Sequence, residues 1–427
     1  MRSIAAAFYR TLLTTQLLPP QKMLQYQRQL IEALVRHARA YVPFYRDTGR
    51  LDVLFDNSNN IDWSRWCDVP IFSRHEAQNN RNALVSEYVP ANMGKTISGA
   101  TTGSTGEPFD HLHTELQLAG ESAISERFYS WYELDRCAAY GRIKGSSRGG
   151  SDPRGKIGAN WNLQDATASL YILPIDSSLD QQIAWLHSAR PRYLETFANL
   201  ADVLFDHTRE NHKPDIFINI GEILRGHLRE KLDRQGIRAV DVYSSMEAGI
   251  LAQECPHCKA LHVTAETSLL ELIDDLNREA QPGALGRVVV TPFYSYAMPL
   301  IRYELGDRAV ATKDQQCSIK LPALREIVGR ERQPFVLRGG ERRWLPLRSS
   351  ELSKYLNYRQ FQIAQTAIGR IEIRVVDNRD ELVKDVAGLN HLISTWMTEP
   401  TIVEVIKVET IERQPNGKLQ DVVCQLQ

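Results

Sequence analysis

Apolar residues at helical spacing dominate the first part of the chain. Residues 1–20 carry a short apolar stretch interrupted by Thr and Gln, which favours an N-terminal helix over a signal peptide. Residues 21–47 place apolar side chains on one helical face and predict a second helix. Pro43 should end that helix, because proline disfavours the α conformation at the residue before it. Residues 112–140 also have helical character.

The middle of the chain alternates short apolar runs with helical segments, an α/β rhythm that extends from residue 161 to residue 310. Residues 216–220 predict a buried strand, and a helix is expected over residues 223–234. Residues 240–243 predict another strand. Residues 269–310 are expected to form antiparallel strands.

Composition shifts beyond about residue 330, where residues 330–348 become rich in arginine. Apolar runs and a helical segment near residues 381–396 then predict a small α+β unit. The expected fold class is therefore α/β, with a large N-terminal domain of mixed sheets and helices over residues 1–330. A small C-terminal α+β domain is expected over residues 331–427.

Residues 97–108, ISGATTGSTGEP, combine three glycines with five hydroxyl side chains. Successive backbone N–H groups in a glycine-rich turn form a concavity that binds anions, and hydroxyls add donors for phosphate oxygens. The segment is a candidate phosphate loop, and a flexible surface loop is the alternative. It matches neither the P-loop pattern GxxxxGK[ST] nor the dinucleotide pattern GxGxxG.

Other candidate residues are ambiguous when taken alone. Glu247 follows the strand predicted over residues 240–243, where a carboxylate can bind a metal ion, cap a helix or face solvent. Asp307 follows Gly306, which permits a turn. Aromatic residues at 128–132 are typical of a protein core, or line an acyl pocket with Trp161.

Cys255 and Cys258 form a C-x-x-C pair shortly before His262, and Cys317 follows 59 residues after Cys258. Two cysteines, a histidine and a later cysteine suit tetrahedral zinc. A pair of free thiols in a loop is the alternative. Four protein ligands would make such a zinc structural rather than catalytic.

Charge and composition exclude some classes of protein. The chain has 51 Lys plus Arg and 52 Asp plus Glu, which argues against nucleic acid as the main partner. No apolar run reaches about 18 residues, so no transmembrane helix is expected. The six cysteines are spread along the chain, which favours a cytoplasmic protein over a secreted disulfide framework.

The order of these segments resembles the adenylate-forming superfamily of acyl-CoA synthetases, adenylation domains and luciferases, and most closely its phenylacetate–CoA ligase branch. The resemblance covers nearly the whole chain. The similar segments are RQLIEALVRHARAYVPFYRD, TTGSTGEP, IGEIL, VYSSMEAG, MPLIRYELGDRA, IVGRERQPFVLRGG and QPNGKLQDV. The phosphate loop and the R-Y-x-x-G-D segment are the most specific of them.

This resemblance implies a role for each matching residue. The triphosphate would be wrapped by Thr102, Gly103, Ser104, Thr105 and Gly106, of which Thr105 is also placed among the catalytic residues. Gly221 and Glu222 would flank the adenine and acyl pockets, and Tyr243 and Ser244 would lie near the adenine. Glu247 would bind Mg²⁺. Asp307 would accept hydrogen bonds from both ribose hydroxyls, and Arg330 would help to hold the ribose. Lys418 would bridge the reacting carboxylate and the α-phosphate. Some relatives place cysteines and histidines similarly around a structural zinc.

The implied activity is ATP-dependent conversion of a carboxylic acid to its acyl-adenylate, followed by acyl transfer to coenzyme A. Transfer to an amine is the alternative within this class, and a catalytically silent relative that binds nucleotide is the alternative outside it. The segment that joins the two domains departs from the family, because Arg332 stands where relatives usually carry an acidic residue. Domain rotation and the identity of the acceptor are therefore open.

Overall fold

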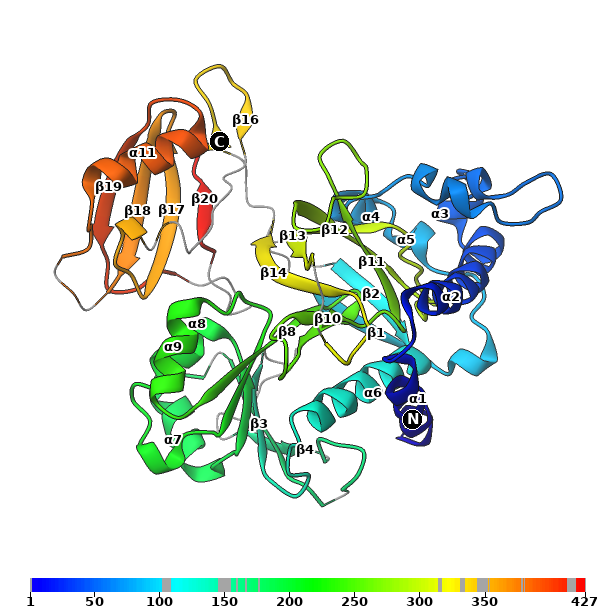
Figure 1. Ribbon diagram of the computed structural model, residues 1–427, viewed down its shortest axis with the longest axis horizontal. Coiled ribbons are helices and arrows are strands. Elements are labelled where there is room, and N and C mark those ends of the chain that lie inside the picture. Colours follow the sequence, from blue (N-terminus) through cyan, green and yellow to red (C-terminus); the bar gives the residue numbers. More distant parts are fainter. Residues whose placement is uncertain are drawn as a thin grey trace. The chain divides into compact units, whose positions relative to one another are not determined.

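The computed structural model describes residues 2–101, 109–144, 155–158, 160–165, 167–175, 177–313, 317–330, 335–343, 352, 354–377, 379, 381–412 and 420–426. Two compact units are present (Figure 1). The first comprises residues 1–140, 157–170 and 240–329, and the second comprises residues 141–156, 171–239 and 330–427. The domain boundary predicted at residue 330 stays a prediction.

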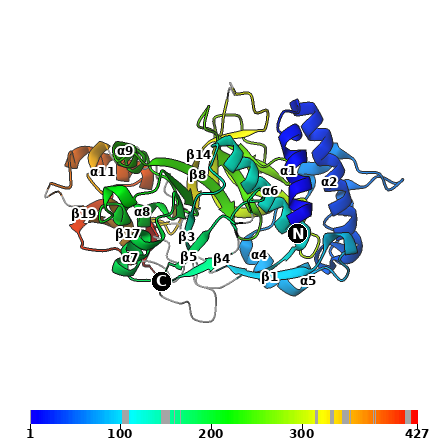
Figure 2. The ribbon, with the colours of Figure 1, turned by 90° about the horizontal axis from the view of Figure 1, so that it is seen from below.

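The helices of the first unit include the two that the hydrophobic pattern predicts near the N-terminus, α1 and α2. They are α1 (Arg2–Thr15), α2 (Pro20–Tyr41), α3 (Pro43–Arg46), α4 (Arg74–Asn79), α5 (Arg81–Leu84) and α6 (Glu115–Trp131), with the short 3₁₀ turns η1 (Asp52–Leu54), η2 (Trp63–Asp68) and η3 (Ala91–Met93). Helix α2 ends before Pro43 as predicted, and Val42 is its extended C-cap. Figures 1 and 2 both show α1 beside α6, which it contacts.

Strands of the first unit form a largely antiparallel sheet in the order β11-β12-β13-β14-β10-β9-β8. Their bounds are β8 (Arg238–Ser245), β9 (Gly249–Glu254), β10 (Leu261–Val263), β11 (Ser268–Ile273), β12 (Leu285–Pro292), β13 (Tyr303–Ala311) and β14 (Ala323–Arg330). Residues 269–310 pair antiparallel as expected. A separate antiparallel pair joins β1 (Thr96–Thr101) to β2 (Phe109–Thr114).

The second unit carries helices on strands in the order β7-β6-β3-β5. The elements of this part are β3 (Tyr140–Lys144), β5 (Leu170–Pro174), α7 (Leu179–Ala189), β6 (Tyr193–Thr196), α8 (Ala198–Leu204), η4 (Glu210–His212), β7 (Ile216–Ile220) and α9 (Gly226–Arg234). Of β4 (Lys156–Gly158), only Lys156 belongs to this unit. Strands β6 and β7 are parallel, and apolar side chains from β6, β7 and the helices form one core. The strand predicted over residues 216–220 is confirmed.

The C-terminal segment of the second unit has its own core. Its elements are β15 (Phe335–Val336), β16 (Arg342–Arg343), β17 (Gln360–Ala367), β18 (Arg370–Val376), α11 (Val386–Met397), β19 (Ile402–Lys407) and β20 (Val422–Cys424). The strands pair in the order β19-β18-β17-β20, and α11 covers the sheet in Figure 1. The α/β fold class and the α+β character of this segment are confirmed.

Three local expectations were wrong. Residues 112–114, expected to begin a helix, belong to β2, because β2 pairs with β1 and Thr114 then caps α6. The expected loop over residues 97–108 begins as strand β1. Asp307 lies inside β13 rather than after a turn, although Gly306 does adopt a positive φ of 77°.

Candidate functional site

Glu247 lies in the tight connection between β8 and β9, at the end of β8 as the sequence indicated. The hydroxyl of Ser245 accepts a hydrogen bond from the N–H of Ala248 at 3.0 Å and stabilises this turn. Glu247 is only 5% exposed, whereas its neighbour Met246 is 59% exposed. A carboxylate this deeply buried needs a cation or strong hydrogen-bond donors near it.

Arg74, the first residue of α4, supplies that cation. Its Nη1 lies 2.5 Å from Oε1 of Glu247, and the arginine side chain is 18% exposed. No local pattern indicates this pair, because 173 positions separate the two residues. Carboxylate oxygens are ligands that Mg²⁺ accepts, so Glu247 fits the predicted role once this ion pair opens.

Two buried histidines of β2 lie on the other side of this turn. His113 contacts the carbonyl oxygen of Met246 through Nε2 at 3.0 Å, and its ring lies 4.5 Å from that of His111. Burial, together with His111, lowers the pKa of His113, so the neutral ring donates to Met246 through Nε2. Sequence analysis missed both histidines, since a strand was not expected there.

Tyr243 and Asp307 meet in the same unit. The hydroxyl of Tyr243 on β8 donates to Oδ2 of Asp307 on β13 at 2.7 Å, and both residues are buried. The structure therefore brings together two residues that were predicted to contact the nucleoside. Ser244 follows Tyr243 on β8, opposite Ile250 of β9.

A bulge in β13 sets the direction of Asp307. The pairing of β12 with β13 shifts register, so that Arg287 and Val289 of β12 face Arg308 and Glu304 of β13. The unpaired residues between them include Gly306, whose positive φ glycine adopts readily. Bulges re-aim side chains and recur beside binding sites.

Gly221 and Glu222 belong to the second unit, just after β7. Gly221 has a positive φ of 77°, which explains a glycine at this turn. Oε2 of Glu222 accepts a hydrogen bond from the N–H of Asn199 at 2.9 Å, and the carbonyl of Glu222 accepts one from the side chain of Asn219 at 2.6 Å. These bonds fix the turn that was predicted to flank the adenine.

The structure brings all four predicted zinc ligands together. Their ligand atoms lie within 4.8 Å of one another, and they come from the turn between β9 and β10, from β10 itself and from the segment before β14. The sulfurs of Cys255 and Cys317 are 3.7 Å apart, and the sulfur of Cys258 is 3.6 Å from Nε2 of His262. A tetrahedral zinc with ordinary bond lengths requires about 3.8 Å and about 3.6 Å for these separations.

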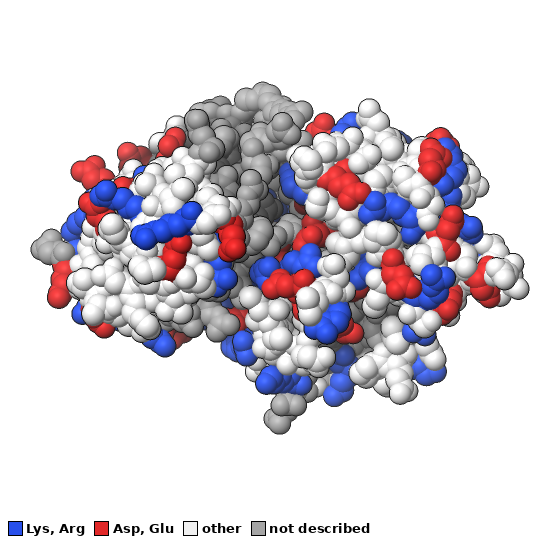
Figure 3. Space-filling model, turned by 90° about the horizontal axis from the view of Figure 1, so that it is seen from above, with Lys and Arg blue, Asp and Glu red and all other residues white. Residues whose placement is uncertain are grey.

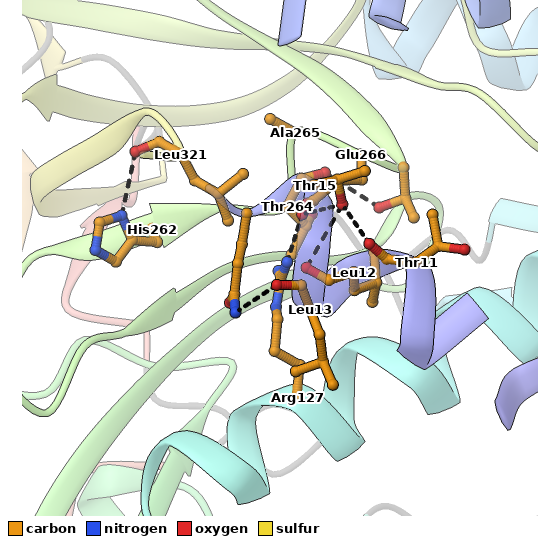
Figure 4. A network of polar contacts seen from close by, with 12 residues as sticks. Thr11, Leu12, Leu13, Thr15, Arg127, His262, Thr264, Ala265, Glu266 and Leu321 are labelled. Atoms are coloured by element: carbon orange, nitrogen blue, oxygen red, sulfur yellow. Dashed lines mark hydrogen bonds and ion pairs between the residues drawn. The ribbon is translucent and has the colours of Figure 1, made fainter. Parts of the chain in front are cut away.

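The surroundings prepare His262 for a metal. Its Nδ1 lies 3.2 Å from the carbonyl oxygen of Leu321 and donates to it, which leaves Nε2 as the lone-pair nitrogen (Figure 4). Burial lowers the pKa of His262 to about 4 and raises the pKa of the Cys255 thiol to about 12. The donor set therefore fits a zinc ion, whose charge would offset the cost of the buried thiolates.

Several predicted residues lie outside the described part of the chain. These are Thr102, Gly103, Ser104, Thr105, Gly106, Arg332 and Lys418. The backbone of Arg330 is described as the last residue of β14. The roles of these residues stay predictions.

Three general features of the described residues concern surface charge, helix hydrophobicity and cysteine state. Lys and Arg side chains are interspersed with Asp and Glu on the face that Figure 3 draws. Among the described residues, no helix has the length and apolarity needed to cross a membrane. The six cysteines are free thiols.

Comparison with known proteins identifies the fold. No family model matches the sequence, and no curated protein matches it significantly. A structure of 2-hydroxyisobutyryl-CoA ligase with 2-HIB-AMP, in the postadenylation state, aligns with a TM-score of 0.71 at 18% identity, over 96% of this chain and 91% of that one. An open conformation of that ligase with 2-HIB-AMP and CoA aligns with a TM-score of 0.65 at 16% identity, over 96% and 93%.

An anthranilate CoA ligase in complex with anthranoyl-AMP aligns with a TM-score of 0.53 at 12% identity, over 75% of this chain and 65% of that one. At such identities the likeness concerns the fold alone. The chain has the fold of the adenylate-forming ligases, which confirms the fold that its motifs implied.

Proposed function

We propose that this chain is an ATP-dependent ligase that converts a carboxylic acid to its acyl-adenylate with release of pyrophosphate, and then transfers the acyl group to coenzyme A. The observation that carries the proposal is the pair of buried carboxylates on this fold, Glu247 after β8 and Asp307 in the β13 bulge, with Tyr243 bonded to Asp307. Solved structures with this fold include ligases bound to an acyl-AMP.

The first half-reaction joins two anions. A carboxylate oxygen of the acid attacks the α-phosphorus of ATP, and the bond from that phosphorus to the bridging oxygen breaks as pyrophosphate leaves. Asp307 would accept hydrogen bonds from the ribose hydroxyls, and Tyr243 would hold the Asp307 carboxylate in place. A Mg²⁺ ion on Glu247 would neutralise phosphate charge when bound, as would the Lys418 ammonium.

In the second half-reaction the sulfur of a thiol attacks the acyl carbon, and AMP leaves. Coenzyme A is the proposed acceptor, since one matching ligase structure holds CoA beside its acyl-AMP. This proposal places the chain near the phenylacetate–CoA ligase branch that its motifs resemble. If the acyl group goes to an amine instead, the acceptor changes and the first half-reaction stays the same.

We further propose a structural zinc held by Cys255, Cys258, His262 and Cys317. The set is closed, with four protein ligands, and the two separations given above suit tetrahedral coordination. The ion would tie the turn between β9 and β10 to the segment before β14. Metal analysis of protein purified without chelator should give one zinc per chain, and its absence would refute the site.

The activity is tested by trapping the acyl-adenylate. The chain is incubated with ATP, Mg²⁺, hydroxylamine and a panel of aryl, branched and straight-chain carboxylic acids. We expect hydroxamate with at least one class of acid, and none with Lys418→Ala. Adding coenzyme A or amines then identifies the acceptor. A chain that binds ATP but forms no hydroxamate with any acid would be the silent relative.

A further inference from the structure

Arg74 is the feature that the proposed mechanism leaves unused. We propose that Arg74 is a positioning residue with two partners: it holds Glu247 in the nucleotide-free chain, and it binds the pyrophosphate end of ATP once Glu247 turns to its metal ion. The inference rests on the proposed function and adds a second cation to its phosphate site.

The backbone before Arg74 is anchored to the strand that carries Asp307. The N–H of Phe72 donates to the carbonyl of Arg302 at 3.2 Å, and the N–H of Glu304 donates to the carbonyl of Phe72 at 3.0 Å. Ser73 then caps α4, so that Arg74 leaves a fixed point. The anchored backbone therefore positions the Arg74 side chain next to Glu247, as expected for a functional residue held by a rigid element.

The ion pair and metal binding make competing demands on one carboxylate. Glu247 is almost fully buried, so it needs a positive charge beside it in every state. In the free chain that charge is the guanidinium, bonded to Oε1. A metal ion that takes Oε1 would displace the guanidinium from that oxygen, and the released guanidinium would then pair with another anion.

Phosphate is the anion that this position favours. A metal ion on Glu247 would be bound to phosphate oxygens of ATP, which places phosphate next to the released guanidinium. The planar fork of arginine matches two phosphate oxygens at once. Arg74 is partly exposed at 18%, so it can reach an arriving ligand without unfolding α4.

The test uses the zinc-loaded full chain without nucleotide, and it measures two affinities. Mn²⁺ binding is followed by electron paramagnetic resonance, and pyrophosphate binding is followed by calorimetry without added divalent ions. Arg74→Ala should bind Mn²⁺ about tenfold more tightly, because Glu247 no longer has a competing partner. The same variant should bind pyrophosphate about tenfold or more weakly. Arg74→Lys should recover part of the pyrophosphate affinity.

The matched control is Arg287→Ala. Arg287 pairs with Glu304 at 2.7 Å, with both side chains about one-sixth exposed, in the same unit. It should change neither affinity. Glu247→Gln should bind pyrophosphate more tightly than the wild type, since Arg74 is released. If Arg74→Ala fails to fold, Arg74→Gln replaces it under the same criteria.

Opposite changes in the two affinities would support the inference, because a merely structural arginine would weaken both. Unchanged affinities, weakening of both, or no pyrophosphate binding by the wild type would overturn it. Failure of the proposed function is recognised separately, by a wild type that binds pyrophosphate as expected but forms no hydroxamate with any acid.

Discussion

Among the buried Arg–Glu pairs of the first unit, Arg127–Glu266 and Arg74–Glu247 share their chemistry and differ in their surroundings. Arg127 on α6 and Glu266 between β10 and β11 are both 0% exposed. Thr15 of α1 donates to the same Glu266 oxygen at 3.3 Å (Figure 4). The guanidinium carbon of Arg127 lies 5.0 Å from the ring centroid of Trp131. Arg74 and Glu247, in contrast, have one member that reaches the surface.

This difference decides what each pair can do. A fully enclosed pair has no replacement ion within reach, so breaking it leaves a buried charge unpaired. The Arg127–Glu266 pair therefore serves to hold α1, α6 and the sheet together. A pair with a partly exposed member can exchange partners when a ligand arrives. The comparison predicts stability effects at the first pair and activity effects at the second.

The largest expected effect is at the enclosed pair. Arg127→Met should lower the free energy of unfolding by about 3–5 kcal/mol, because Glu266 is left buried without its partner. Urea unfolding measures this loss. The double variant Arg127→Met/Glu266→Leu should regain most of it. A single variant as stable as the wild type would show that the pair is not structural.

The open pair should behave in the opposite way. Glu247→Gln should slow hydroxamate formation by about 10²–10³, the usual effect of removing one preorganised charge contact. Its unfolding free energy should change far less than that of Arg127→Met, since Arg74 can reach solvent. Single-turnover trapping at saturating ATP measures the rate. A fully active variant would remove Glu247 from the site.

Metal removal tests a second enclosed cluster. If zinc binds as proposed, its loss should cost about 2.7 kcal/mol when free zinc is a hundred times its dissociation constant. Thermal unfolding with and without a tight chelator measures this, with re-addition of zinc as the control. An unchanged melting temperature in protein that the chelator has stripped of zinc would contradict a stabilising role.

Tyr243→Phe tests whether the hydrogen bond between Tyr243 and Asp307 contributes to nucleoside binding. Removal of the hydroxyl deletes the 2.7 Å hydrogen bond to Asp307 and leaves the ring in place. A hydrogen bond to a charged group contributes about 1.5–3 kcal/mol of stabilisation. The ribose hydroxyls of bound ATP would restore part of this stabilisation by donating to Asp307. We expect the KM for ATP to rise up to about tenfold, with kcat little changed. A fall in kcat alone would argue against this role.

The smallest expected effect is a pH dependence far from both pairs. His37 contacts the carbonyl of Tyr296 at 3.0 Å, and burial lowers its pKa in the folded chain. The unfolded chain then binds more protons than the folded one below about pH 6.5, so stability falls as pH drops through that value. His37→Gln should show a shallower fall between pH 7 and pH 5 in urea unfolding. Identical profiles would contradict this assignment.

Sequence analysis selected candidate site residues that lie in continuous motifs. Glu247 and Asp307 were identified from short segments, and the zinc ligands from their spacing. The helix end at Pro43 followed from local backbone chemistry. Such features depend on neighbours a few positions apart, which the sequence displays directly.

Features that depend on pairing between distant segments were missed. Strand β2 forms because β1 offers it a partner, so a helical prediction over residues 112–114 failed. The bulge at Gly306 arises from the register of β12 against β13, and a glycine before an aspartate indicated a turn instead. Arg74 becomes a site residue only because β13 binds the backbone before it.

Exchange of labelled pyrophosphate into ATP by the wild-type chain, measured with each carboxylic acid, tests whether the chain forms an acyl-adenylate. We expect exchange that requires both an acid and Mg²⁺ and that disappears in Lys418→Ala. A folded, zinc-loaded chain that shows no acid-dependent exchange, or a Lys418→Ala variant that exchanges as fast as the wild type, would contradict it.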